Sequence, residues 1–214
     1  FNGDKVITEN GDEWGRNLIS TKIIAGHGSD LVEIEPLNGI PRYKNTLKTP
    51  NVSNNFGYRI TQPIPYTADA GTKFTVSFKV KFYKFQRQGR SMTGYIRTQN
   101  KDGTQSTYQF TGLPDFNLEE NRDRWIDYTF TFTLSKPIEA FANFYFYADY
   151  VLEGEAEYTA PKLEKGPVAT PWTPAPEDYA NYDYKNKECD IELGVILPDE
   201  SVEYVSIGKF TVEN

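Results

Sequence analysis

The residue types that most often carry catalysis are scarce in this chain. His27 is the single histidine and Cys189 the single cysteine, and we expect a domain boundary to separate them. A Cys/His pair is therefore unexpected, and a Ser/His/Asp triad would depend on His27 alone, with no G-x-S-x-G nucleophile motif in the chain. One histidine and one cysteine also argue against a zinc site. These counts indicate a chain without catalytic activity.

Paired carboxylates are the remaining candidates for catalysis. Glu33/Glu35 and Glu155/Glu157 have the i, i+2 spacing that places both side chains on one face of a strand. Glycoside hydrolysis instead requires two carboxyl groups held apart across a cleft, with the pKa of one raised. We interpret both pairs as charged residues of solvated strand faces.

Aromatic side chains favour a different chemistry, the binding of sugars. Sugar rings stack on aromatic faces, while planar polar groups hydrogen-bond the hydroxyls. The segment 141–149 is aromatic on both faces, with Phe144 and Phe146 on one side. The candidates on the other side are Tyr145 and Tyr147, together with Asn143 and Asp149. The alternative is that these tyrosines cover a second hydrophobic layer or the connector that follows the domain.

A second set of candidates lies on neighbouring strands. Tyr95 and Arg97 share one strand face, Tyr108 lies on the partner strand of an expected hairpin, and Tyr83 lies on another strand. Gln99 and Gln109 could add amide groups nearby. Ordinary cross-strand pairing of Tyr and Arg on an exposed sheet explains this set as well.

The amino-acid composition restricts the classes of molecule that the chain could bind. The chain has 214 residues, 15 Tyr and 14 Phe, a formal net charge of −7 and a pI near 4.9. Tyrosine and phenylalanine favour strands. The acidic balance argues against nucleic acid and anionic membranes, both of which attract basic surfaces. No run is long and apolar enough to predict insertion into a membrane.

Alternating apolar and polar residues predict the strands that position these candidates. The clearest are Lys73–Phe85 and Arg124–Leu134, and Trp125 at the start of the latter is expected in the core. Segments 91–99 and 104–111 flank an Asp-Gly turn and predict a hairpin. Further strands are expected near 31–36, 42–48, 56–62, 155–164, 189–197 and 202–212. Many short strands separated by turns predict an all-β fold, a jelly-roll β-sandwich with a C-terminal strand-pair extension.

The segment 162–178 predicts how the chain leaves the sandwich. Its sequence, K-L-E-K-G-P-V-A-T-P-W-T-P-A-P-E-D, contains four prolines, which prevent a helix or a central strand from continuing. Trp172 stands among small residues and prolines, as expected of an anchor that pins an extended segment to the domain.

This segment resembles the end of the carbohydrate-binding-module-like β-sandwiches found in tail and baseplate proteins of phages that infect Gram-positive bacteria. Gly15-Arg16-Asn17-Leu18-Ile19 and the run 124–132 are also similar to parts of these modules. The resemblance spans residues 13–178. It implies an N-terminal linker at 1–12, the sandwich at 13–178, and at 179–214 a connector plus hairpin or the start of a neighbouring tail domain.

The resemblance implies a non-catalytic carbohydrate-binding module in the virion tail, acting at the host cell surface. Its expected partners are cell-wall polysaccharide or teichoic acid of the host, and other tail or baseplate proteins. No cofactor is expected; for a structural Ca²⁺, which is common in such sandwiches, the oxygen ligands would come from Asn17, Glu33, Asp149 and Glu164. The alternatives are a structural spacer that binds only tail proteins, and an accessory module of a bacterial glycoside hydrolase.

Overall fold

The computed structural model describes residues 6–7, 13–47, 54–88, 91–159, 161–179, 188–196 and 202–211. The chain divides into two compact units, residues 1–178 and 179–214. In the part of residues 1–179 that the structure describes, the regular elements besides β-strands are three short helical turns, Thr21–Ile23, Glu119–Asn121 and α1, Pro176–Tyr179. None of the helices in the described ranges is long and apolar enough to cross a membrane.

The first sheet is built around the first half of β12, Ile138–Thr159. On one side this half pairs with β9 (Thr93–Asn100), which in turn pairs with β10 (Gln105–Gln109). On the other side it pairs with β6 (Asn54–Ile60) and β7 (Ile64–Ala68), and β3 (Ile24–Gly26) lies beyond β6. All of these pairings are antiparallel.

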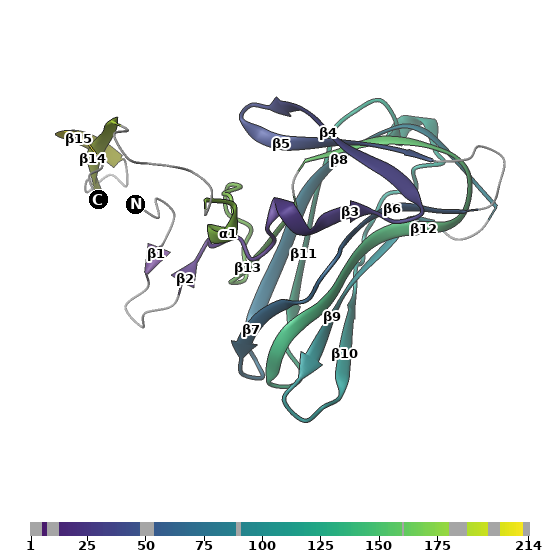
Figure 1. Cartoon of the computed structure of the whole chain (residues 1–214), viewed down its shortest axis with the longest axis horizontal. Helices are drawn as coiled ribbons and strands as arrows, with labels where there is room; N and C mark the ends of the chain where they lie inside the picture. The colour runs from purple at the N-terminus through teal and green to yellow at the C-terminus, as the bar shows by residue number, and fades with distance from the viewer. Residues whose placement is uncertain are drawn as a thin grey trace. The chain divides into compact units, whose positions relative to one another are not determined.

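The second sheet contains the second half of β12, because this strand curves from one sheet into the other (Figure 1). Here β12 pairs with β5 (Ile40–Leu47) and, on its other side, with the end of β8 (Lys73–Arg87). At one edge of this sheet β4 (Ser29–Leu37) pairs with β5. At the other edge β11 (Ile126–Thr133) and β13 (Lys162–Lys165) pair with the start of β8, one on each side.

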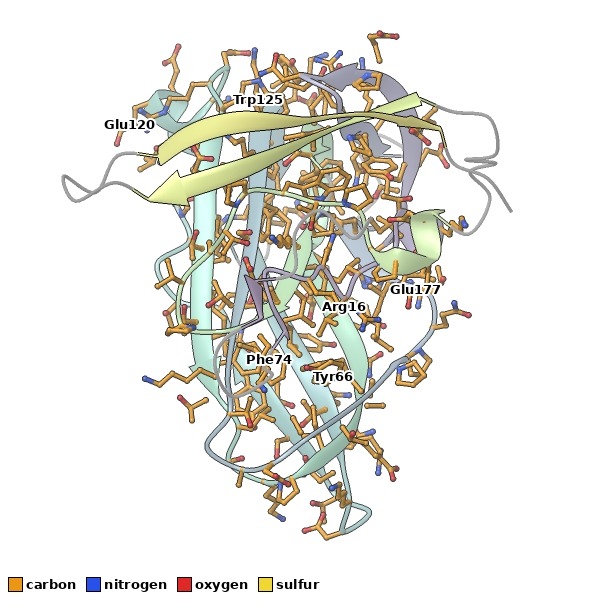
Figure 2. The ribbon with its side chains drawn as sticks, turned by 90° about the vertical axis from the view of Figure 1, so that its left-hand side faces the viewer. Arg16, Tyr66, Phe74, Glu120, Trp125 and Glu177 are labelled. Atoms are coloured by element: carbon orange, nitrogen blue, oxygen red, sulfur yellow. The ribbon has the colours of Figure 1, made fainter. Side chains whose placement is uncertain are left out.

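Aromatic side chains fill the space between the sheets. Along β8, Phe74, Phe78 and Phe82 are buried. Residue Tyr66 on β7 meets Phe74 edge to face, with ring centroids 5.6 Å apart (Figure 2). Burying large rings supplies most of the favourable free energy of folding, and the alternating burial of each strand follows from it.

The predicted fold class, an all-β jelly-roll sandwich with a C-terminal strand pair, is confirmed. The strands expected at 73–85 and 124–134 and the hairpin across the Asp-Gly turn are present. In the second unit β14 (Glu188–Ile196) pairs antiparallel with β15 (Val202–Thr211). The connector at 180–187 and the turn at 198–201 lie outside the described residues, as does most of the predicted linker at 1–12, where β1 (Val6–Ile7) pairs with β2 (Glu13–Trp14).

Three features differ from the prediction. The strand expected at 155–164 is divided: its first part continues from the segment 141–149 in one strand, β12, because an irregularity between Ala148 and Val151 interrupts the alternation without ending the strand, and its last residues belong to β13. The short strands β3 and β7 were not predicted. Trp125 precedes β11 and is half-buried instead of lying in the core (Figure 2).

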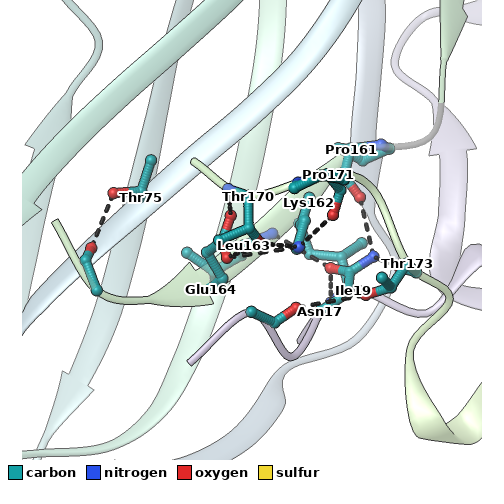
Figure 3. Close-up of polar contacts among 12 residues, drawn as sticks. Asn17, Ile19, Thr75, Pro161, Lys162, Leu163, Glu164, Thr170, Pro171 and Thr173 are labelled. Carbon is teal, nitrogen blue, oxygen red and sulfur yellow. Dashed lines mark hydrogen bonds and ion pairs between the residues drawn. The ribbon is translucent and has the colours of Figure 1, made fainter. Parts of the chain in front are cut away.

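A buried ion pair holds the exit segment against the sandwich (Figure 3). Lys162 and Glu164, on β13, are each 1% exposed, and Lys162 Nζ lies 3.4 Å from Glu164 Oε2. The Lys162 ammonium donates to Thr170 Oγ1 and the Pro171 carbonyl, both at 2.6 Å. Thr170 donates its N–H and hydroxyl to the Glu164 carboxylate, at 2.9 and 2.6 Å. The two charges are thus surrounded by partners, as buried charges require.

The N-terminal segment is fixed to the same region by Asn17. Its side-chain oxygen accepts the N–H groups of Ile19 (3.0 Å) and Leu163 (3.2 Å), and its amide nitrogen donates to the carbonyls of Thr173 (3.1 Å) and Pro161 (3.4 Å). Figure 3 shows Asn17 between β13 and the exit segment.

Asp178, at the end of the exit segment, closes the arrangement. Its carboxylate accepts hydrogen bonds from the Ser20 hydroxyl (2.7 Å), from the N–H and hydroxyl of Thr21 and from the N–H of Ala175. Arg16 and Glu177 also approach each other at 3.8 Å (Figure 2). We call the network of Asn17, Lys162, Glu164, Thr170 and Asp178 the exit lock.

Removing one charge of the exit lock should strongly destabilise the first unit. Lys162→Met leaves the buried Glu164 carboxylate without its cation, and such losses cost about 3–5 kcal/mol. Replacing both residues, with Lys162→Met and Glu164→Leu, should cost less than either single change. Chemical denaturation of the full chain measures these differences. The exposed ion pair between Lys79 and Asp127 (3.0 Å) is the matched control, and Asp127→Asn should cost at most about 1 kcal/mol. If Lys162→Met lowers the free energy of unfolding by no more than this control, the stabilising role of the exit lock is contradicted.

Candidate functional site

Tyr145 and Tyr147 project from the outer side of β12. Phe144 and Phe146, which alternate with them, are buried in the core, so the two tyrosines must point the other way. Tyr95 lies directly opposite Tyr145 on β9, and their rings are stacked with centroids 5.1 Å apart. The structure therefore brings together three predicted candidates from two strands.

His27 completes this cluster from the loop after β3. Its imidazole meets the rings of Tyr145 and Tyr147 edge to face, with both centroid distances 5.1 Å. The backbone N–H of His27 donates to the carbonyl of Gly57, the residue opposite Tyr147 on β6. We call the cluster of His27, Tyr95, Tyr145 and Tyr147 the aromatic face.

Sequence reasoning considered His27 only as a catalytic residue and missed its place here. The signal was present in the glycines on either side of it. A Cβ on Gly26 would lie 2.1 Å from the Ser29 carbonyl oxygen, and one on Gly28, where φ is +71°, would lie 2.3 Å from the Asn55 carbonyl oxygen. Only glycines let this loop approach the neighbouring strands closely enough for the imidazole to reach the tyrosines.

Polar groups surround the aromatic face. Arg59 lies opposite Tyr145 on β6, and Arg97 lies opposite Asn143 on β9. The Arg97 guanidinium lies 5.3 Å from the centre of the Tyr95 ring. The amides suggested by the sequence are also present, since Gln109 is opposite Tyr95 on β10 and bonds the Thr93 hydroxyl. These donors and acceptors border the rings.

The local electrostatics of the aromatic face favour the uncharged forms of His27 and Tyr95. Burial lowers the pKa of His27, and the positive charge of Arg59 lowers it further. The negative charge of Asp149 acts in the other direction and raises this pKa. Burial raises the pKa of the Tyr95 hydroxyl, against the effect of Arg97. The Asn55 side-chain amide lies 3.2 Å from His27 Nε2, and an amide nitrogen donates, which fits a neutral imidazole unprotonated at that nitrogen.

Two predicted residues lie elsewhere. Tyr108 is paired with the buried Ile96, which places it on the side of the hairpin opposite Tyr95. Its ring packs on Phe132 at 4.6 Å and its hydroxyl accepts the N–H of Ser135. Tyr83 lies on β8 in the second sheet, with the Lys81 ammonium 4.8 Å from its ring centre. The structure does not bring Tyr83 and Tyr108 to the aromatic face.

The residues considered for calcium do not form a site. Asn17 and the Glu164 carboxylate are already occupied by the hydrogen bonds of the exit lock. Asp149 is on β12 and Glu33 on β4. Within the described part of the chain, no group of three or more His, Cys, Asp or Glu side chains could hold a metal ion.

The carboxylate pair on β12 is engaged in ion pairs. Glu155 lies 2.8 Å from Lys44 Nζ and 3.9 Å from Lys84 Nζ, and Glu157 lies 3.4 Å from an Arg42 guanidinium nitrogen. The pair has the chemistry of a charged strand face.

A hollow of about 350 Å³ lies between the exit segment and the strands β8 and β11. Trp172 lines it together with Phe78 and Tyr128, as expected of an anchor packed over the sheet. Part of its polar lining is engaged, because Lys79 is paired with Asp127 and the Lys79 N–H is bonded to Thr159 Oγ1, whereas the Trp172 indole nitrogen is buried without a hydrogen-bond partner.

Comparison with known proteins gives similarity of fold only. No protein-family model and no curated protein matches the chain. Among solved structures, the CBM22-1 xylan-binding domain of Paenibacillus barcinonensis Xyn10C is 10% identical, with 70% of this chain and 90% of that chain covered and a TM-score of 0.43. A family 16 carbohydrate-binding module is 11% identical over 64% of this chain and 85% of that chain, with a TM-score of 0.39.

A viral protein is also among the similar structures. The tripod (BppUct-A-L) from the baseplate of bacteriophage Tuc2009 is 21% identical, with 76% of this chain covered and a TM-score of 0.45. The match covers 59% of the tripod chain. These similarities are partial, and the β-sandwich fold of this chain is shown by its own strand pairing.

The lowered pKa of His27 makes a prediction about stability. In the unfolded chain the imidazole has a pKa of ~6.5. In the folded protein the pKa of His27 is lower, so the folded protein binds this proton only at lower pH. As the pH falls from 7 to about 5.5, the unfolded state therefore gains protons first and the free energy of unfolding decreases. His27→Phe keeps an aromatic ring but removes the titration, so its stability should fall less over this range. Denaturation of both proteins across the range measures the difference; parallel curves would contradict the assignment.

Proposed function

We propose that residues 13–178 form a non-catalytic carbohydrate-binding module and that the aromatic face binds the sugar. The observation that carries the proposal is the cluster of His27, Tyr95, Tyr145 and Tyr147 on the outer side of the first sheet. The rings hold one another in place, so little side-chain entropy remains to be lost when a sugar stacks on them.

The polar border suits a ligand rich in hydroxyl groups. Arg59, Arg97 and the amide of Asn143 can donate hydrogen bonds, and Asp149 can accept them. Both arginines lie next to tyrosines in a chain whose net charge is −7. This combination of stacking surface and mixed donors and acceptors supports a saccharide more than an apolar ligand.

The setting we propose is the tail or baseplate of a phage that infects Gram-positive bacteria. The support is the resemblance carried by residues 15–19, 124–132 and 162–178. The ligand would be cell-wall polysaccharide or teichoic acid of the host, and other tail or baseplate proteins would carry the module on the virion. Open stacking sites bind weakly one at a time, and many copies on one particle would supply adhesion through avidity.

Replacing Tyr145 and Tyr147 together by Ala should weaken binding of the purified chain to host-wall polysaccharide roughly 10- to 100-fold, because two stacking rings are lost. The measurement is labelling of a panel of Gram-positive cells by the fluorescent full chain, with purified wall polysaccharides as competitors. The double variant should unfold cooperatively, since its core residues are unchanged.

Tyr83→Ala is the matched control, because this tyrosine lies on β8 away from the aromatic face. It should label cells as well as the original chain. If the double variant labels cells normally, the aromatic face does not bind the sugar. If no strain is labelled even by a multimerised chain, the proposed function fails and a structural spacer becomes the better account.

A further inference from the structure

Tyr150 has an unusual backbone conformation for a tyrosine. Its φ is +53°, in the left-handed region that residues with large side chains avoid. Among the described residues, the other non-glycine residues with positive φ are Asn38 and Asp123, two types that tolerate this region. A tyrosine here costs free energy that asparagine would largely avoid.

Burial of the Tyr150 side chain offsets little of this free-energy cost. It is 60% exposed, one of the most exposed large apolar side chains among the described residues. Backbone strain that packing does not explain is found most often where a side chain serves a function. The position therefore calls for a role outside the core.

The irregularity in β12 sets the direction of this side chain. Ala148 and Val151 are both fully buried, so the two residues between them, Asp149 and Tyr150, lie on the side away from the core. The backbone is held in this conformation by the N–H of Gln88, which donates to the Tyr150 carbonyl at 2.9 Å. Tyr150 thus belongs to the same outer side of β12 as Tyr147.

Asp149 links Tyr150 to the aromatic face. Its carboxylate is close enough to influence the pKa values of both His27 and Tyr95. Tyr150 follows Tyr147 by three residues in β12, with Asp149 between them. The order along the strand is therefore stacking ring, hydrogen-bonding carboxylate, stacking ring. That order fits a chain of sugars better than a single sugar.

We propose that Tyr150 is a second stacking subsite, which binds a further sugar ring of an extended saccharide held by Tyr145 and Tyr147. This inference rests on the proposed function, and it adds that the ligand is an oligomer whose rings follow the outer side of β12. Asp149 lies between the two stacking positions and accepts hydrogen bonds from sugar hydroxyls.

Tyr150→Asn separates a binding role from a structural one. Asparagine tolerates the left-handed conformation but lacks the ring, so the variant should unfold at the same or a higher temperature. The probe is a set of size-sorted oligosaccharides released from purified wall polysaccharide of a Gram-positive strain that the chain labels. Long oligosaccharides should bind the variant roughly 2- to 10-fold more weakly than the original chain. Disaccharides, which reach only one stacking position, should bind both proteins equally.

Two further variants serve as controls. Tyr150→Phe retains the ring and should bind long oligosaccharides almost normally. Leu118→Asn removes an apolar side chain that is 48% exposed and lies outside the first sheet. It should change neither the unfolding temperature nor the binding of oligosaccharides.

Three results would overturn the inference. If Tyr150→Asn binds long oligosaccharides normally while the Tyr145/Tyr147 double variant does not, Tyr150 is no subsite and the proposed function stands. If Tyr150→Asn lowers the unfolding temperature, the ring is structural. If the original chain binds neither the polysaccharide nor any oligosaccharide, the proposed function falls and the subsite with it.

Discussion

The register of β12 is the constraint on which the rest of this structure depends. The side chains of Phe144, Phe146 and Ala148 are at most 1% exposed. A register shift of one residue would turn them outward and bury Tyr145, Tyr147 and Asp149 in their place. Exposing two phenylalanines and burying hydroxyl and carboxylate groups in their place would cost many kcal/mol. The packing of the core therefore determines which rings face outward.

The same strand joins the two sheets, and this connects the fold to the site. Its first half holds Tyr145 between β6 and β9, and its second half is paired with β5 and β8. The irregularity between Ala148 and Val151 lies where one set of partners gives way to the other. A curved strand needs such a feature, and it is also what turns Asp149 and Tyr150 outward.

The segments that carry the family resemblance lie in the exit lock more than in the site. Lys162, Glu164 and Thr170 hold one another, and Asn17 fastens the N-terminal segment to them. Such residues are needed wherever a sandwich must fix its first and last segments, whatever it binds. Similarity in these motifs therefore reports the fold, whereas the bound saccharide depends on residues of the sheet and its loops.

The sequence predicted the parts of the structure that depend on local alternation. The strands around Phe74 and Phe130 and the outward direction of Tyr145 follow from it. It could not predict that Tyr95 stacks on Tyr145, because this depends on pairing between distant strands, and the direction of Tyr108 depends on the register of the hairpin, in which Tyr108 is paired with Ile96. His27 was missed although the glycines beside it signal a close backbone approach, since the strand that its loop approaches is set by contacts with β6.

The most direct test of the account is an NMR titration of the full chain with labelled tyrosine rings against wall oligosaccharides. The account predicts that the ring signals of Tyr95, Tyr145 and Tyr147 shift together as the saccharide binds, while those of Tyr83 and Tyr108 stay in place. Shifts confined to Tyr83 or Tyr108, or binding without any change at the aromatic face, would contradict it.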